Sequence, residues 1–107
     1  LIEEAMDRGL TLYLENMFDE SPEPIAEVVA AMNHPALRVC LDVAHAEIFS
    51  ALPLTAWIDA LGPYIGHVHI NDCDGVLDQH LALGDGVLPL RDSIERIESV
   101  GLEPTYT

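Results

Sequence analysis

The sequence predicts an α/β fold, in which parallel strands alternate with helices as a layered sheet or as a barrel. Two observations support this prediction: apolar strand-like runs alternate with helical patterns along the 107 residues, and these runs end in ionisable residues. Strands separated by helices pair in parallel through right-handed crossovers. Half of the residues are hydrophobic (50%), which indicates a packed core and excludes a disordered acidic chain.

Each expected element has a local reason. A first helix over residues 1–8 ends at Gly9, because glycine often terminates helices in the left-handed conformation. A helix over 24–32 is indicated by apolar residues at helical spacing, and the segment 33–35 stops it before a proline. The remaining segments are expected as strands at 10–14, 37–43 and 65–70, helices at 54–61 and 89–100, a polar loop at 71–86, and the beginning of a fourth strand at 103–107.

The charge and the cysteines limit the partners and the compartment. Four Lys and Arg residues against 19 Asp and Glu residues give a formal net charge of −15, so no nucleic-acid partner is expected. No apolar run approaches the about 20 residues of a membrane span, so no membrane partner is expected. Cys40 and Cys73 lie in or beside apolar strand-like runs with no signal peptide before them. We therefore expect reduced thiols and a cytoplasmic protein.

Ligand-type side chains follow the first three expected strands. Glu15 follows the first, Asp42 and His45 follow the second, and His69 and Asp72 follow the third. In parallel α/β folds the carboxyl ends of the strands carry the active site. Asp42 and His45 can serve one metal ion or two adjacent ones. Mixed Asp, Glu and His sets without Cys suit Zn, Mn, Co or Mg, so the sequence favours a site for a divalent metal.

Two further pairs have a spacing of two residues. His67 and His69 alternate in the third strand, which places both imidazoles on one face of that strand. His67 is interpreted either as a packed residue or as a contact to metal or substrate. Asp78 and His80 repeat the spacing with a carboxylate and an imidazole, a pair that can hold a divalent cation in an extended segment. Asp72, in a turn-rich stretch, can also bond to the backbone of a turn.

Five motifs together carry a resemblance to a known family. They are Leu14-Glu15-Asn16, Leu41-Asp42-Val43-Ala44-His45, His67-Val68-His69-Ile70-Asn71-Asp72, Asp78-Gln79-His80 and Leu83-Gly84-Asp85-Gly86. In this order and spacing they resemble the xylose isomerase-like TIM barrel superfamily, which includes sugar phosphate isomerases and epimerases and, more distantly, the endonuclease IV type of apurinic-site nuclease. The resemblance implies that residues 1–107 form the C-terminal half of a (β/α)8 barrel, about four βα units with parallel strands.

The resemblance also implies roles for the strand-end residues. Glu15, Asp42 and His69 correspond to ligands of a divalent metal ion. The family's fourth ligand, a Glu on the last strand, is expected beyond Thr107. His45 corresponds to a residue that contacts substrate or a second metal ion.

The polar loop supplies the remaining candidates for a second metal ion or for substrate. In the nuclease branch of the family, the pair corresponding to Asp78 and His80 joins the counterpart of His45 around an additional zinc. His67 is retained as a further candidate for the same purposes.

The function implied is a divalent-metal-dependent sugar isomerase or epimerase acting on a ketose or hydroxy-ketone through an enediolate. Glu15 and His45 are its expected catalytic residues, the first exchanging a proton and the second orienting a substrate hydroxyl. The expected partner is a small-molecule sugar. Two alternatives stay open: an apurinic-site endonuclease-like phosphodiesterase, kept by His45, Asp78 and His80, and a non-catalytic metal- or sugar-binding barrel remnant. A half barrel leaves sheet edges unpaired, so self-association or pairing with the missing half is also expected.

Overall fold

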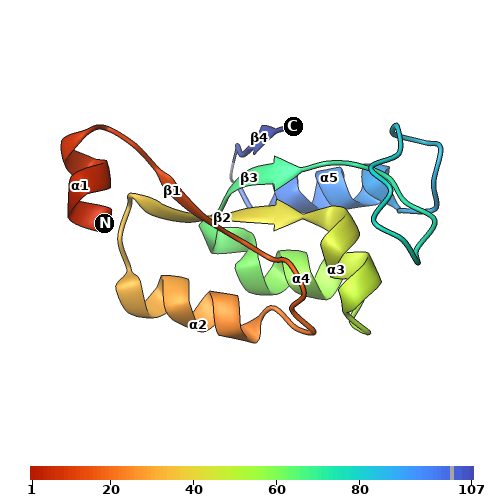
Figure 1. Cartoon of the computed structure of the whole chain (residues 1–107), viewed down its shortest axis with the longest axis horizontal. Helices are drawn as coiled ribbons and strands as arrows, with labels where there is room; N and C mark the ends of the chain where they lie inside the picture. Colours follow the sequence, from red (N-terminus) through yellow and green to blue (C-terminus); the bar gives the residue numbers. More distant parts are fainter. Residues whose placement is uncertain (102) are drawn as a thin grey trace.

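A parallel sheet of four strands forms the centre of the molecule (Figure 1). The computed structural model describes residues 1–101 and 103–107. The strands are β1 (Leu12–Glu15), β2 (Leu37–Asp42), β3 (Ile65–His69) and β4 (Thr105–Tyr106), and they lie side by side in the order of the sequence. All three neighbouring pairs are parallel. This arrangement confirms the predicted α/β fold with parallel strands.

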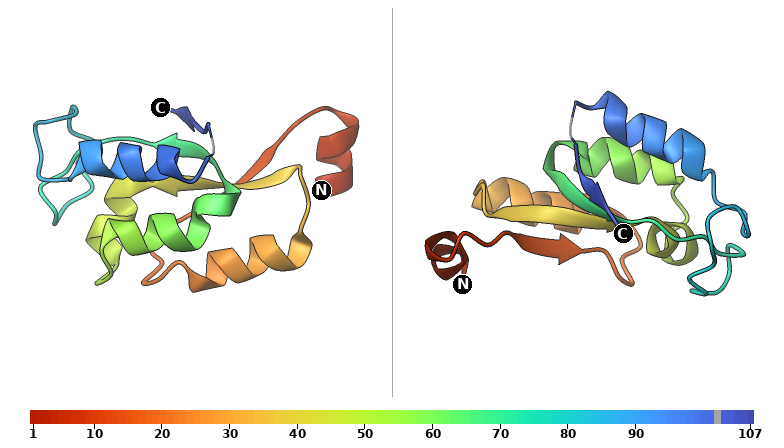
Figure 2. Two further views of the ribbon diagram at one scale, coloured as in Figure 1. Left: turned by 180° about the vertical axis from the view of Figure 1, so that it is seen from behind. Right: turned by 90° about the horizontal axis from the view of Figure 1, so that it is seen from above.

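Helices α2, α4 and α5 cover one side of the sheet (Figures 1 and 2). Contacts of α2 with β2 and α4, and of α4 with α5, join them into one layer. The helices are α1 (Ile2–Asp7), α2 (Glu23–Met32), α3 (Val43–Phe49), α4 (Leu54–Leu61) and α5 (Leu90–Ser99), with a short 3-10 helix η1 (Gly62–Tyr64). Among the described residues, no helix is both long and apolar enough to cross a membrane.

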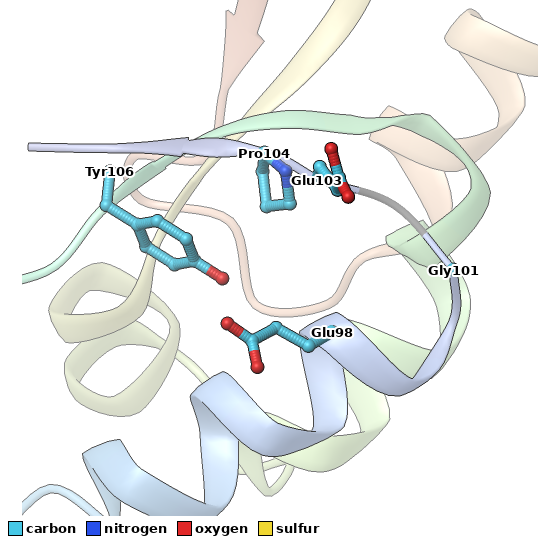
Figure 3. A pocket seen from close by; sticks show the side chains of 5 residues that line it. All are labelled: Glu98, Gly101, Glu103, Pro104 and Tyr106. Atoms are coloured by element: carbon cyan, nitrogen blue, oxygen red, sulfur yellow. The ribbon is translucent and has the colours of Figure 1, made fainter.

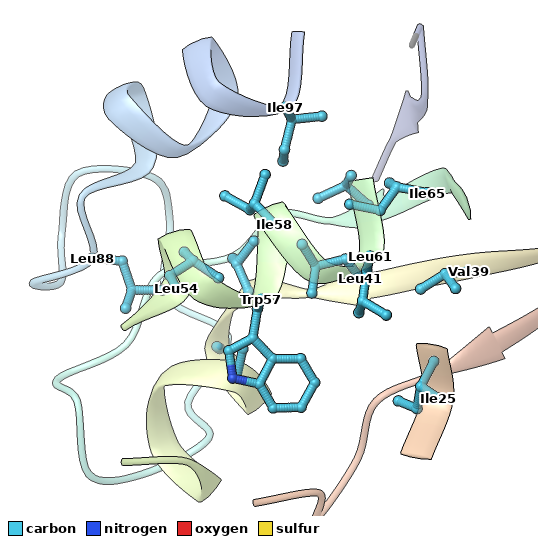
Figure 4. Close-up of a cluster of buried hydrophobic side chains, with 14 of the residues drawn as sticks. Ile25, Val39, Leu41, Leu54, Trp57, Ile58, Leu61, Ile65, Leu88 and Ile97 are labelled. Atoms are coloured by element: carbon cyan, nitrogen blue, oxygen red, sulfur yellow. The ribbon is translucent and has the colours of Figure 1, made fainter. Parts of the chain in front are cut away.

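The core lies between the sheet and this helical layer (Figure 4). Trp57 and Ile58 of α4 and Leu41 of β2 belong to this core, and all three side chains are fully buried. Ile58 points toward Ile97 of α5. Burying each large apolar side chain contributes about 1.5–3 kcal/mol relative to leaving it exposed. The same core also contains Ile25, Val29, Val39, Leu61, Ile65, Val68 and Ile97. The strands are apolar on this face, and Glu15, Asp42 and His69 stand at the carboxyl ends of β1, β2 and β3.

Helix α3 was not expected from the sequence. The predicted strand 37–43 ends at Asp42, and the chain turns at once into α3. The cause is local: Oδ1 of Asp42 accepts hydrogen bonds from the backbone N–H groups of Ala44 and His45, both at 3.0 Å. An aspartate at this position caps the N-terminus of a helix. The cap therefore places His45 in the first turn of α3.

The expected polar loop lies between β3 and α5, beyond the carboxyl ends of the strands and on the same side as α3 (Figure 1). It contains an isolated antiparallel bridge between Asp72 and Leu81 and no longer strand or helix within residues 70–89. The other boundaries are close to the predicted ones. Helix α1 ends before Gly9, which has the expected left-handed conformation with φ of +65°.

We predict that the isolated 107-residue chain self-associates. Strands β1 and β4 are the two edges of an open sheet, and Tyr13 and Leu10 beside the β1 edge are exposed. Unpaired edges next to apolar side chains favour pairing with another chain. Sedimentation velocity at micromolar concentration should show dimers or larger species, and a monodisperse monomer would contradict the prediction.

Candidate metal centre

Three of the predicted site residues end three neighbouring strands. Glu15 is the last residue of β1, Asp42 of β2 and His69 of β3, and the sheet register pairs Asp42 directly with His69. Nδ1 of His69 lies 3.0 Å from Oε1 of Glu15 and 3.6 Å from Oδ2 of Asp42. The fold thus brings the three side chains together at the carboxyl edge of the sheet, where the sequence analysis expected them.

The carboxylate of Asp42 is the most buried charged group of this cluster, with a relative exposure of 1%. While Oδ1 caps α3, Oδ2 faces Nδ1 of His69 and lies 3.8 Å from Nδ1 of His45. Nδ2 of Asn71 donates a long hydrogen bond to the same oxygen at 3.5 Å. A buried carboxylate requires such partners, because desolvation without hydrogen bonds or opposite charge is costly.

Asn16 is a site residue that belongs to one of the five motifs but for which the sequence predicted no role. Its Nδ2 donates to the carbonyl oxygen of Asp42 at 2.9 Å, and its Oδ1 accepts from the backbone N–H of Asp42 at 2.8 Å. This fully buried side chain continues the pairing of β1 with β2 after β1 has ended at Glu15. The only sequence signal was an amide residue directly after a strand-end carboxylate.

His45 is held from two sides. Nδ1 donates to the carbonyl oxygen of Asn16 at 2.9 Å, since a carbonyl can only accept, and Nε2 lies 3.2 Å from Oδ2 of Asp78. Burial lowers the pKa of His45. The Asn16 carbonyl and the carboxylates of Asp42 and Asp78 raise it by a larger amount together, so the resulting pKa lies above its ordinary value. The ring is therefore oriented with Nε2 toward the polar loop.

The polar loop brings Asp78 and His80 to the same cluster. Oδ2 of Asp78 bonds to His45, and Oδ1 lies 3.1 Å from Nε2 of His80. The Asp78 carboxylate therefore links an imidazole on α3 to an imidazole on the loop. His80 is exposed and has a left-handed backbone with φ of +51°, which is uncommon for a residue other than glycine.

His67 lies outside this cluster. It shares a face of β3 with His69, as its spacing predicted, and the two ring centroids are 5.3 Å apart. However, both of its ring nitrogens are bonded to the hydroxyl groups of Thr105 and Thr107, at the β4 side. This engagement leaves neither nitrogen of His67 free for a ligand in the structure.

A second group of possible ligands, Cys40, His67 and His69, has ligand atoms within 4.8 Å of one another. Burial and the Glu15 carboxylate raise the pKa of Cys40 to about 11, so the thiol is protonated at neutral pH. The group of Glu15, Asp42 and His45 has the same compactness with ligands of the harder, oxygen-rich kind. The two carboxylates of Glu15 and Asp42, which lie beside the imidazoles of both His45 and His69, are therefore the better candidate ligands for a divalent cation.

One pocket adjoins the site, and another lies elsewhere. One of about 450 Å³ opens beside the cluster and is lined by His69, Asn71 and His80 together with the apolar residues Ile70, Leu81, Ala82 and Leu83, and by Thr107. Another, of about 390 Å³, lies where α5 leads into β4 and is lined by Glu98, Gly101, Glu103, Pro104 and Tyr106 (Figure 3). The second pocket contains none of the predicted site residues. The first has both polar and apolar walls next to the carboxylates.

Carboxylates and imidazoles gathered at the carboxyl ends of a parallel sheet are typical of the active sites of parallel α/β proteins, TIM barrels among them. The chain belongs to the family described as "Xylose isomerase-like TIM barrel", whose sequence pattern matches residues 1–105. The family inferred from the motifs is thereby confirmed, and so is the partial barrel.

Relatives of known sequence include sugar epimerases. The fructoselysine 3-epimerase of Escherichia coli O157:H7 is 32% identical over 94 residues, which cover 88% of this chain and 34% of the epimerase. An uncharacterised protein of Methanocaldococcus jannaschii is 27% identical over 110 residues, covering 96% of this chain and 38% of its own length. The chain thus spans little more than a third of these relatives.

Solved structures give the same picture. A D-tagatose 3-epimerase-like protein superposes with a TM-score of 0.83 and 27% identity, covering 98% of this chain and 42% of that protein. The TTHB071 protein of Thermus thermophilus, from a crystal soaked with ZnCl2, matches with a TM-score of 0.73 and 29% identity over 92% of this chain and 48% of its own. The described residues therefore share the fold of part of each of these two proteins.

We predict that Asn16→Ala destabilises the metal-free complete protein. The substitution leaves the buried N–H and carbonyl groups of Asp42 without partners, and each such group costs about 1–3 kcal/mol. Urea unfolding should show the loss, whereas the control Glu95→Ala, at an exposed position of α5, should leave the midpoint nearly unchanged. Equal midpoints for Asn16→Ala and the unmodified protein would show that the amide pair contributes nothing.

Proposed function

We propose that the complete protein is a divalent-metal-dependent sugar epimerase or isomerase that acts on a ketose or hydroxy-ketone in the cytoplasm, with residues 1–107 as the C-terminal half of its barrel. The observation that carries this proposal is the convergence of Glu15, Asp42 and His69 at the strand ends of a chain whose relatives include epimerases. The free thiols of Cys40 and Cys73 support the compartment.

The donor set fits a divalent cation. One imidazole nitrogen of His69 lies within 3.6 Å of oxygens from both Glu15 and Asp42, and repulsion between the two carboxylates would be relieved by a positive ion. In the proposal these three residues hold the metal, which is Mn, Zn, Co or Mg, and a Glu beyond Thr107 is the fourth ligand. When bound, such an ion supplies Lewis-acid stabilisation of negative charge on substrate oxygens.

The chain's own residues perform the proton chemistry of the proposal. Glu15 lies half-buried beside the pocket and serves as the group that removes or returns a proton at the carbon next to the carbonyl group. His45, held by the Asn16 carbonyl at Nδ1 and by Asp78 at Nε2, orients a substrate hydroxyl in the proposal. His69, Asn71 and His80 line the space for the sugar. His67 supports the neighbouring His69 through packing.

We predict that the complete protein binds a divalent metal ion and that Asp42→Asn weakens this binding. The loss should be at least about 100-fold, because removal of a group that merely supports a ligand already costs about 10–100-fold. Competition titration of Mn²⁺ against a fluorescent chelator measures the change. The control Asp85→Asn removes an exposed carboxylate and should bind metal like the unmodified protein.

We predict that the metal-loaded complete protein interconverts ketoses and that Glu15→Gln lowers kcat by about 100- to 10,000-fold, the range for loss of a general acid–base group. Chromatography of a panel of free ketoses measures turnover. Glu27→Gln, on the exposed side of α2, is the matched control and should retain activity. The isolated 107-residue chain should be inactive, because the second proton-exchanging Glu is expected beyond its end.

An abasic-site DNA oligomer belongs in the same assay. The link from His45 through Asp78 to His80 supplies ligands that a phosphodiesterase could use around a second metal ion. Cleavage of the oligomer without turnover of any ketose would replace the epimerase proposal. Neither activity in the metal-loaded complete protein would favour a binding barrel without catalysis.

A further inference from the structure

We propose that Asp72 is a positioning residue: its buried carboxylate holds the loop of residues 73–88 in the one conformation that brings Asp78 to His45. The inference rests on the proposed function, because it assigns to Asp72 the alignment of a residue of that site. Asp72 belongs to neither group of possible ligands among the described residues, and its hydrogen bonds there go only to loop backbone.

The carboxylate of Asp72 gathers four backbone N–H groups. Oδ1 accepts from Cys73 at 3.0 Å and from Leu88 at 3.1 Å, and Oδ2 accepts from Gly84 and Gly86, both at 3.0 Å. Desolvation raises the pKa of Asp72. The four hydrogen bonds lower it by a larger amount together, so the resulting pKa lies below its ordinary value. The ionised group thus joins the start of the loop to its far end.

The backbone of Asp72 adds a second attachment next to the functional residues. Its N–H donates to the carbonyl oxygen of Leu81 at 3.1 Å, and its carbonyl oxygen accepts from the N–H of Leu81 at 2.8 Å. Leu81 directly follows His80, whose backbone is left-handed. The segment 73–80 is therefore a closed loop, and Asp72 fixes both of its ends.

Close packing around the carboxylate restricts the sequence as well. A Cβ atom at Gly86 would collide with the Asp72 carboxylate and with the backbone oxygen of Cys73. Only a glycine lets the chain approach closely enough for the N–H of residue 86 to reach Oδ2. The arrangement thus combines a buried anion with a backbone shaped to surround it.

A carboxylate is required because all four partners are donors. An asparagine of the same shape would turn a donor NH2 group toward two of the N–H groups, which leaves them without acceptors. The loop would then lose its closed shape, and Asp78 would lose its place 3.2 Å from Nε2 of His45. His45 would keep its bond to Asn16 on the other side. The proposed metal ligands Glu15, Asp42 and His69 bond to one another and to groups outside the loop of residues 73–88 in the described part of the chain, so metal binding would be unaffected.

The test compares Asp72→Asn with Asp78→Asn and with the double variant in the complete protein. The control is Asp85→Asn, the same change in the same loop at an exposed side chain between Gly84 and Gly86. We expect the first two variants to shift the imidazole nitrogen resonances of His45 alike in the metal-free protein, and the control to leave them in place. We also expect each to lower kcat/KM about tenfold, the double variant to be no worse than either, and the affinity for Mn²⁺ to change less than twofold.

If Asp72 has a purely structural role, Asp72→Asn would lower the unfolding midpoint without moving the His45 resonances, and this result would overturn the inference. Additive losses of activity in the double variant would overturn it as well. If the unmodified protein turns over no ketose, the resonances and the metal affinity still decide the question, so the two proposals fail separately. If Asp72→Asn does not fold, amide exchange in the unmodified protein replaces it. Slow exchange at Gly84, Gly86 and Leu88 supports the anchor, and exchange as fast as in a free peptide refutes it.

Discussion

The desolvated carboxylate of Asp42 is the constraint on which the site depends. A charge buried at the end of a central strand is tolerated only where donors and opposite charge surround it. One oxygen caps α3, and the other faces imidazole nitrogens of His45 and His69. The same residue therefore ends a strand, starts a helix and orients two histidines. The start of α3 and the end of β3 are thus both in contact with the Asp42 carboxylate.

Asn16 extends that constraint to β1. Its side chain bonds to both backbone groups of Asp42, and its own carbonyl accepts from His45. The end of the first strand is thus fixed against the end of the second by an amide that mimics backbone pairing. Glu15, which precedes Asn16, is held at the same edge as a result. The carboxylates of Glu15 and Asp42 lie close together because the sheet register and the Asn16 amide position the two strand ends side by side.

The excess of acidic residues has more than one cause. Some carboxylates lie on solvated helix faces, as for Glu27 and Glu95. Others hold backbone: Asp74 accepts from the N–H groups of Val76 and Leu77, and Asp72 accepts from four N–H groups within the loop. In these turns the carboxylate substitutes for the regular pairing that a long loop lacks. A part of the net negative charge is therefore structural.

The sequence alone determined the parallel α/β fold, the family, the strand ends that carry Glu15, Asp42 and His69, and the extent of the polar loop. The family was inferred from the resemblance of five motifs, and the other features depend on local periodicity and on residue types at strand ends, which a single chain displays directly. Asp72 was also recognised as a residue that could bond to turn backbone, but its span of 16 residues to Leu88 was not.

Only the tertiary structure decided which partners the polar groups choose. The role of Asn16 and the turn of His67 toward β4 rest on such choices. Helix α3 differs, because its cap by Asp42 is local and the sequence interpretation missed it. Asn16 and Asp42 are 26 residues apart, and His67 and Thr105 are 38 apart. Hydrogen bonds between groups so distant in sequence have no local pattern, because it is the sheet register and the helix packing that bring the partners together.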